Sequence, residues 1–347
     1  MIVSENEIRN SGTLLPLNPI PVLTEFIKTM SHVRATHASH IVLPESVTDK
    51  PTVFSFLINH FKQIDATIWQ QRIIDGKVHW RDGRLITLDC AFVPRERVYY
   101  YREVAVEKKI PFTEKIIYED NNIIVAYKPH FLAVSPSGQF VNECLVNRLR
   151  IKTGIETLVT AHRLDRATAG LMLLSKHPEQ RHLYHDLFKH GSITKYYQAI
   201  AQLTPDLRRQ HNEGSLTLPR HWTVKNRIVK GEPSFTMQIS DGEANSHSQI
   251  ELIDVKGEFG LFRLSPITGK THQLRLHMHS LGMPLVNDRL YPTLLDRCDD
   301  NFNQPLQLLA QQLKFTDPVT GIKHDITTDL LDIEAIVDKR VDVITPI

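Results

Sequence analysis

The sequence predicts an α+β protein, and the order of its strand and helix patterns carries that prediction. Apolar runs on both sides of a polar turn indicate two strands over residues 116–128, and another strand pattern covers 192–202. Apolar residues four apart over 177–191 indicate an amphipathic helix. These patterns follow one another without a regular strand–helix–strand alternation, which favours α+β over a doubly wound parallel fold.

The chain has 347 residues, enough for two domains. Residues 1–50 show little periodicity, so we expect an irregular N-terminal arm. Residues 51–105 contain two helical patterns, the second capped by Asp65, and then a strand, a turn at Asp82-Gly83 and a strand. They predict a small separate module. The larger domain is expected over 112–330 and a C-terminal tail over 331–347.

The larger domain can be assigned element by element. "IIYEDNNIIVAYKP" is typical of a hairpin, "CLVNRLRIKTG" of a helix closed by its glycine, and "GLMLLSK" of a buried segment. After the amphipathic helix and the strand "SITKYYQAIAQ" comes a polar excursion over 205–247. The hairpin "SQIELIDVKGEFGLFRLSPI" and the helix "THQLRLHMHSLG" follow. This order predicts a mixed sheet flanked by helices.

Composition excludes several classes of protein. No apolar run approaches the roughly 18 residues that a membrane span needs, and the polar, acidic start argues against a secretory signal. Three scattered cysteines are too few for a disulfide framework or a CxxC metal knuckle, so we expect a cytoplasmic protein without membrane attachment. A net charge of +2 permits nucleic-acid binding without requiring it.

Three short motifs suggest chemistry that their context does not support. "TGKTH" lacks the first glycine of a phosphate-binding loop, because Leu264 stands there. "HRLD" lacks the asparagine that follows the aspartate in a kinase catalytic loop. His272, His277 and His279 lie five and two residues apart, so they do not share one helix face, whereas zinc-binding histidines of a helical motif lie four apart. We therefore expect no metal and no cofactor.

Three polar residues have unusual placements. Asp165 lies between Arg163 and Arg166 just before the buried run, where burial disfavours its ionised form unless a cation stabilises it. Arg275 lies between two leucines of a helix and needs a carboxylate partner. Tyr197 lies next to Tyr196 in a strand, and alternation sends the two rings to opposite faces, so at least one could be inward and stack on a ligand. These features suit a structural ion pair as well as a catalytic one, and the residues alone leave both open.

Four segments together resemble the motifs of the RluA family of pseudouridine synthases. They are "IIVAYKPHFLAVSPSG", "AHRLDRATAGLMLLSK", "KYYQAI" and "GKTHQLRLHMHSLGMPLVNDRLY", in the family's order over roughly 115–292. The resemblance implies the pseudouridine synthase fold, a mixed, mainly antiparallel central sheet. Residues 51–105 are similar to the alpha-L RNA-binding module, although they contain fewer basic residues than a strong binder needs. A domain that only caps the catalytic body remains the alternative.

The resemblance also implies an activity. The family converts uridine to pseudouridine in structured RNA, either ribosomal or transfer RNA, without a cofactor. Asp165 would be the nucleophile on a flipped base, Arg275 would pair with it, and Tyr197 would stack on the uracil. We expect Asp165 and Arg275 to lie within hydrogen-bond reach, beside Tyr197. We also expect a monomer without an obligatory protein partner. A catalytically silent RNA-binding or RNA-folding factor with the same fold is the alternative.

Further residues of the motifs are expected to contact RNA. They are Lys128, His162, Arg163, Arg166, Thr168, His272 and Gln273. Two positions depart from the family pattern. Ala169 replaces a serine, which removes a hydroxyl near the nucleophile, and Asn287 replaces the glycine before Asp288, which could alter a tight turn.

Overall fold

The computed structural model describes residues 33–46, 52–295 and 299–336. Most of the expected arm over 1–50 and the end of the expected tail over 331–347 lie outside the described residues. No described helix has the length and apolar character needed to cross a membrane.

A small module forms the N-terminal part of the described chain. Its elements are β2 (Ser39–Val42), α2 (Val53–His60), α3 (Ala66–Ile74), β3 (Val78–Trp80) and β4 (Arg97–Tyr100). The Asp65 carboxylate accepts a hydrogen bond from the backbone N–H of Thr67 and caps α3, as its position predicts. The helices pack on the sheet β2-β4-β3 around the buried Leu57 and Trp69. The module therefore has its own core.

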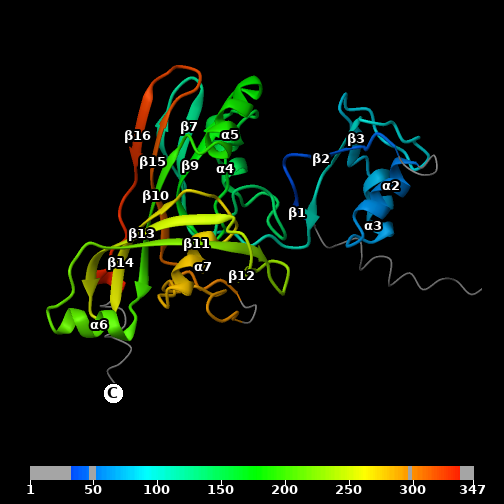
Figure 1. Ribbon diagram of the computed structural model, residues 1–347. Coiled ribbons are helices and arrows are strands. Elements are labelled where there is room, and N and C mark those ends of the chain that lie inside the picture. Colours follow the sequence, from blue (N-terminus) through cyan, green and yellow to red (C-terminus); the bar gives the residue numbers. More distant parts are fainter. Residues whose placement is uncertain (1–32, 47–51, 296–298, 337–347) are drawn as a thin grey trace, which may run out of the picture.

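Figure 1 shows this module to one side of the larger body, joined to it by extended chain. Two short strands, β1 (Val33–Arg34) and β5 (Glu103–Val104), pair with each other at the junction. The side chain of Asn142, from the larger body, donates a hydrogen bond to the carbonyl of Arg34 at 3.0 Å. The junction therefore has direct polar contacts besides the covalent link.

The larger body is built on one sheet. Within the described residues its order is β12-β11-β13-β14-β10-β15-β9-β7-β6, with β8 paired to β9 and β16 to β15. Only the pair β9–β15 is parallel among these described pairings. The expected α+β fold with a mixed, mainly antiparallel sheet is confirmed.

The first half of the body contains β6 (Lys115–Glu119), β7 (Ile123–Lys128), α4 (Leu145–Thr153), β8 (Val159–Thr160), β9 (Ala169–Ser175) and α5 (Arg181–Lys189). Every residue of β9 is buried, as its apolar sequence predicts. Gly154 ends α4 with φ +71°, a left-handed conformation that glycine adopts without strain. The expected hairpin and both expected helices are present.

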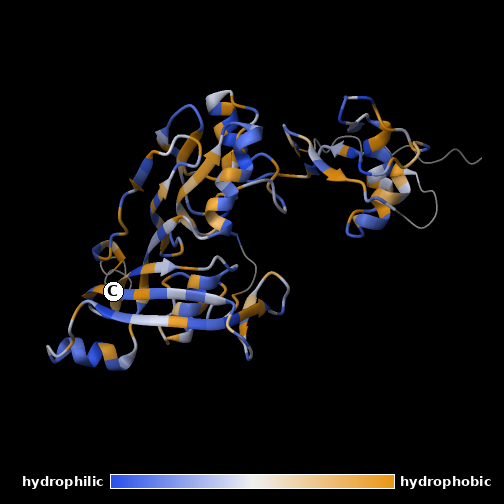
Figure 2. Ribbon diagram, turned by 45° about the horizontal axis from the view of Figure 1, so that its top comes forward, coloured by the Kyte–Doolittle hydropathy of each residue, from blue (hydrophilic) through white to orange (hydrophobic). Residues whose placement is uncertain are grey.

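The second half contains β10 (Thr194–Gln202), α6 (Pro205–Asn212), β11 (Arg220–Lys230), β12 (Met237–Ser240), β13 (Ser246–Lys256), β14 (Phe259–Pro266), α7 (Gln273–Ser280), β15 (Leu308–Thr316) and β16 (Lys323–Thr327). The polar excursion over 205–247 forms α6, strand β11 and the edge strand β12. Figure 2 shows α6, at the lower left, as a mostly hydrophilic helix at the margin of the body. Polar sequence is tolerated there because an edge strand and a surface helix face solvent.

The sheet divides into two branches beyond the short pairing of β9 with β15, which is limited to Ala169–Leu309 and Gly170–Ala310. One branch contains β6, β7, β9 and β8, and the other contains β10, β15 and β16. Further along, β16 pairs with the edge of β15 that β9 has left, and β8 pairs with the corresponding edge of β9. Gly170 permits the close pairing, because a Cβ there would lie 2.3 Å from the carbonyl oxygen of Ala310. A separate apolar core fills the space between the branches.

Candidate active site

Asp165 lies in the loop between β8 and β9, beside a cavity of about 120 Å³. Its carbonyl accepts a hydrogen bond from the backbone N–H of Thr168 at 3.1 Å, which closes a turn just before β9. Tyr197 of β10 and Arg275 of α7 line the same cavity. Residues from three distant segments of the chain therefore meet at one place, as the sequence predicts.

The principal partner of Arg275 differs from the expected one. Arg275 is 4% exposed, and its guanidinium donates to both carboxylate oxygens of Asp288, at 2.8 Å from Nε and 2.5 Å from Nη2. The nearest approach of Arg275 to Asp165, from Nη1 to Oδ2, is 3.7 Å. The expected ion pair with Asp165 is therefore present, but it is too long for the expected hydrogen bond. Asp288 makes the stronger, bidentate pair with Arg275.

Backbone hydrogen bonds fix the carboxylate of Asp288 in the position where it binds Arg275. One of its oxygens also accepts hydrogen bonds from the backbone N–H groups of Leu290 and Tyr291. Burial opposes the charge of Arg275, but Asp288 and then Asp165 outweigh it and raise the arginine pKa. The arginine is therefore a permanent cation beside Asp165. Sequence reasoning missed this role, although the aspartate of the closing motif was the available signal.

His272 provides a second group facing Asp165. Its Nε2 lies 3.8 Å from Oδ2 of Asp165, and its Nδ1 lies 2.8 Å from the hydroxyl of Tyr291. That hydroxyl accepts from the backbone N–H of Met237, so its own proton is available for Nδ1. Burial lowers the pKa of His272, which favours the neutral ring. In that arrangement the remaining ring proton is on Nε2 and points to Asp165.

Tyr197 stays in its phenol form. Burial and then the negative charge of Asp165 raise its pKa above the ordinary range of tyrosine. The ring packs against two apolar cores of the body, which fix its position at the cavity wall. Tyr197 can therefore stack on a planar ligand or donate a hydrogen bond to it.

Lys128, one of the residues expected to contact RNA, is instead structural. It is 0% exposed and does not line the cavity, whereas the buried Thr168 and Gln273 do. The ammonium of Lys128 donates to the carbonyls of Pro129, Leu132 and Arg166 at 3.0, 2.9 and 3.2 Å. Burial corrects the expectation only for Lys128, because Thr168 and Gln273 line the cavity beside Asp165. Lys128 instead fastens the end of β7 to the loop that carries Asp165.

Of the other basic residues expected to contact RNA, His162 and Arg166 have partners within the protein, whereas Arg163 is exposed. The ring of His162 stacks on Phe188 at 4.2 Å, and burial lowers its pKa to about 3, so it is a neutral part of the core. Arg166 makes a bidentate pair with Asp300, at 2.7 Å for both bonds. Arg163 is exposed and lines the cavity. Of these three, Arg163 is the best placed for a phosphate.

The two departures from the family pattern have small structural effects. Ala169 is fully buried and pairs with Leu309 inside the sheet. Asn287 adopts φ +61°, a left-handed conformation that asparagine tolerates better than most residues. The backbone turn before Asp288 is therefore kept without glycine.

Lys128 predicts a measurable pH dependence of stability. Burial lowers its pKa to about 7 in the folded chain, below its ordinary unfolded value of about 10.4. Between these values the unfolded chain holds a proton that the folded chain has lost, so raising the pH from 7 to 10 favours folding. The free energy of unfolding of the wild type, relative to Lys128→Met, should rise by up to about 1.4 kcal/mol per pH unit.

Urea unfolding at several pH values measures this difference. The exposed Lys189 serves as the control, since Lys189→Met should show no comparable dependence. A constant difference between wild type and Lys128→Met from pH 7 to 10 contradicts the prediction.

The sequence is similar to known RNA pseudouridine synthases. A model of the RNA pseudouridylate synthase family matches residues 122–280. Ribosomal large subunit pseudouridine synthase C of Rickettsia bellii is 31% identical over 255 residues, which cover 72% of this chain and 78% of that protein. The dual-specificity RNA pseudouridine synthase RluA of Vibrio cholerae is 32% identical over 205 residues, covering 58% and 77%.

Among solved structures, the chain is similar to human RNA pseudouridylate synthase domain containing 1. The TM-score is 0.49 at 19% sequence identity, and the match covers 70% of this chain and 99% of that one. On the strength of the sequence relatives, the chain belongs to the RluA family of RNA pseudouridine synthases.

Proposed function

We propose that this RNA pseudouridine synthase acts on uridines of structured ribosomal or transfer RNA, with Asp165 as the nucleophile. The observation that carries the proposal is the position of Asp165 beside a small cavity, with a buried arginine 3.7 Å and a histidine 3.8 Å from its Oδ2. The ribosomal target in the name of one relative, and the dual specificity in the name of another, support the class of RNA.

The size of the cavity supports base flipping. About 120 Å³ can hold a flat ring and excludes a duplex. A uridine within folded RNA must therefore leave its stack to reach Asp165, at a cost of a few kcal/mol. The exposed Arg163 and Lys270 line the cavity and offer positive charge to the flanking phosphates.

In the proposed reaction the glycosidic C–N bond breaks, the uracil turns, and its carbon 5 bonds to the same ribose carbon. The carboxylate of Asp165 attacks either the ribose or the base, and Arg275 and His272 keep it anionic and oriented. Tyr197, as a phenol, stacks on the uracil and donates to it. The bond to Asp165 breaks again, carbon 5 loses its hydrogen to solvent as a proton, and the freed N1 of the uracil takes up a proton, so the reaction is an isomerisation with no net redox change.

Loss of that hydrogen gives the test. Structured RNA labelled with tritium at carbon 5 of uridine should release tritium to water in the presence of the chain. RNA labelled at carbon 6 should release none, because that bond is kept. Mapping pseudouridine in cellular RNA with and without the protein then identifies the position. RNA binding without tritium release from any ribosomal or transfer RNA would favour the silent RNA-binding factor.

A further inference from the structure

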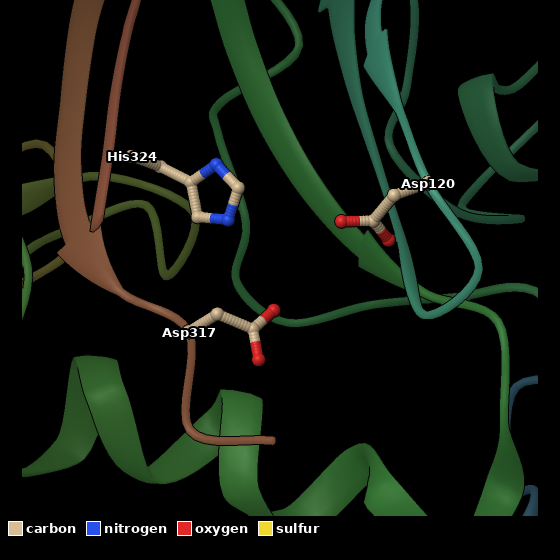
Figure 3. A group of neighbouring side chains, drawn as sticks. All are labelled: Asp120, Asp317 and His324. Atoms are coloured by element: carbon tan, nitrogen blue, oxygen red, sulfur yellow. The ribbon is translucent and has the colours of Figure 1, made fainter. Parts of the chain in front are cut away.

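A second cluster of chemically capable side chains lies far along the sheet from Asp165. Asp120 belongs to the turn between β6 and β7, and Asp317 and His324 belong to the turn between β15 and β16 and to β16 itself. One oxygen of each carboxylate and one ring nitrogen all lie within 4.8 Å of one another. Figure 3 shows the three side chains converging from the two branches of the sheet.

Asp317 is 1% exposed and is fixed in place. Its Oδ1 accepts from the backbone N–H groups of Val319 and Thr320 at 2.7 and 2.8 Å. Its Oδ2 accepts from the hydroxyl of Tyr184 at 3.0 Å. One lone pair of Oδ2 therefore remains for another partner.

Asp120 is held in the same manner. Its Oδ1 accepts from the backbone N–H groups of Asn122 and Ile123, at 2.8 and 2.9 Å, and its Oδ2 accepts from the hydroxyl of Tyr118 at 3.0 Å. These hydrogen bonds fix the carboxylate in place and leave a free lone pair on Oδ2.

His324 is the observation that points to a ligand. The residue is 8% exposed, and its Nε2 is fully buried without a hydrogen-bond partner in the described part of the chain. Its ring is held by stacking on Phe315 and by edge contact with Tyr118. Figure 3 shows a ring nitrogen turned toward both carboxylates. Buried polar atoms normally have a hydrogen-bond partner, so an unpaired ring nitrogen that faces two carboxylates indicates that a ligand binds between the three side chains.

The charge of the cluster leads to the same conclusion. Among the described residues, no lysine or arginine pairs with the carboxylate of Asp317 or Asp120. Neither acid makes an ion pair within 4.0 Å with His324 in the described structure. Two acids that are this close and partly desolvated repel each other unless a cation compensates them.

We propose that Asp120, Asp317 and His324 bind a divalent transition-metal ion, with Zn²⁺ as the best fit. Two ligands of a tetrahedral zinc ion, at about 2.0–2.2 Å each, are roughly 3.3–3.6 Å apart, so the three ligand atoms, which lie within 4.8 Å of one another, need to move only slightly to bind it. One imidazole nitrogen with two carboxylate oxygens favours zinc over magnesium or calcium, which prefer oxygen ligands. Asp120 is partly exposed, so a water molecule can complete the coordination.

The ion has a structural role, because it joins the two branches at their open end. One branch contributes the β6–β7 turn and the other the β15–β16 turn, and the apolar core between the branches lies directly beneath. Strand β9, which begins four residues after Asp165, contributes Leu171 and Leu173 to that core. The metal therefore stabilises the layer that supports the loop of Asp165 and takes no part in the reaction.

Zinc titration of the full chain tests the proposal. After chelator treatment and dialysis, calorimetry with Zn²⁺ alone should show one site, and zinc should raise Tm by several degrees. Asp317→Asn and His324→Gln should each weaken this binding about 100-fold and abolish the Tm shift. Asp325→Asn, which changes an exposed carboxylate on the same strand, should bind zinc as the wild type does. Equal binding by all four chains overturns the proposal.

A second measurement covers variants that fail to fold. Co²⁺ added to the metal-free wild type should give the visible spectrum of a nitrogen–oxygen site, which equimolar Zn²⁺ removes. A thiolate charge-transfer band would assign the ion to cysteine and overturn the proposal. So would stability that depends on pH but not on zinc, since that result would indicate a direct pair between His324 and the carboxylates.

Discussion

Asp165→Asn should abolish pseudouridine formation while RNA affinity stays within a few-fold of the wild type. The amide keeps the size of the carboxylate and its backbone turn, but it cannot ionise and is not a nucleophile. Removing a nucleophile that acts together with its partners lowers kcat by about 10⁴-fold or more. Tritium release under single-turnover conditions measures the rate, and filter binding measures the affinity.

The control is Asp186→Asn, an acid on α5 outside the cavity, which should keep full activity. Retained activity in Asp165→Asn would remove the nucleophile assignment. A parallel loss of RNA binding would contradict it in another way, because the carboxylate would then serve binding and not the chemical step.

The sequence predicted the participants of the site better than their partners. The apolar context of Asp165, Arg275 and Tyr197 made them unusual, the resemblance to the RluA motifs assigned their roles, and the fold brings them to one cavity. Local patterns do not give distances between distant segments, so the ion pair of Arg275 with Asp165 was predicted but its closer, bidentate pair with Asp288 was missed. Asp288 was interpreted as part of a turn, and only the tertiary structure shows its two hydrogen bonds to the guanidinium.

Burial explains the other differences. A lysine followed by a proline at the end of a strand looks exposed in sequence, yet three backbone carbonyls around Lys128 make its burial possible. Helices and hairpins of the body were predictable because caps, glycines and apolar spacing are local signals. Asp120, Asp317 and His324 share no spacing, since two branches of the sheet bring them together. No ligand motif could have revealed them.

Arg275→Ala should impair both stability and activity, and the double variant with Asp288→Ala should separate the two effects. Truncating Arg275 leaves the buried carboxylate of Asp288 unpaired, which costs about 3–5 kcal/mol in the free energy of unfolding. Removing both groups should recover much of that loss, because no uncompensated charge remains. Urea unfolding of the two single variants and the double variant gives the coupling energy.

The exposed pair of Arg209 and Asp206 is the matched control, with an expected coupling below about 1 kcal/mol. Additive losses at Arg275 and Asp288 would contradict a strongly coupled buried pair.

Activity should respond differently from stability. The double variant lacks the cation beside Asp165, so its kcat should stay about 10²–10³-fold below the wild type even when its stability is largely recovered. Arg275→Lys keeps a charge but cannot bind Asp288 through two parallel bonds, so it should restore only part of the rate. If the double variant regains full activity, Arg275 serves only to pair with Asp288. If it stays inactive while well folded, the guanidinium acts on Asp165 across the 3.7 Å gap.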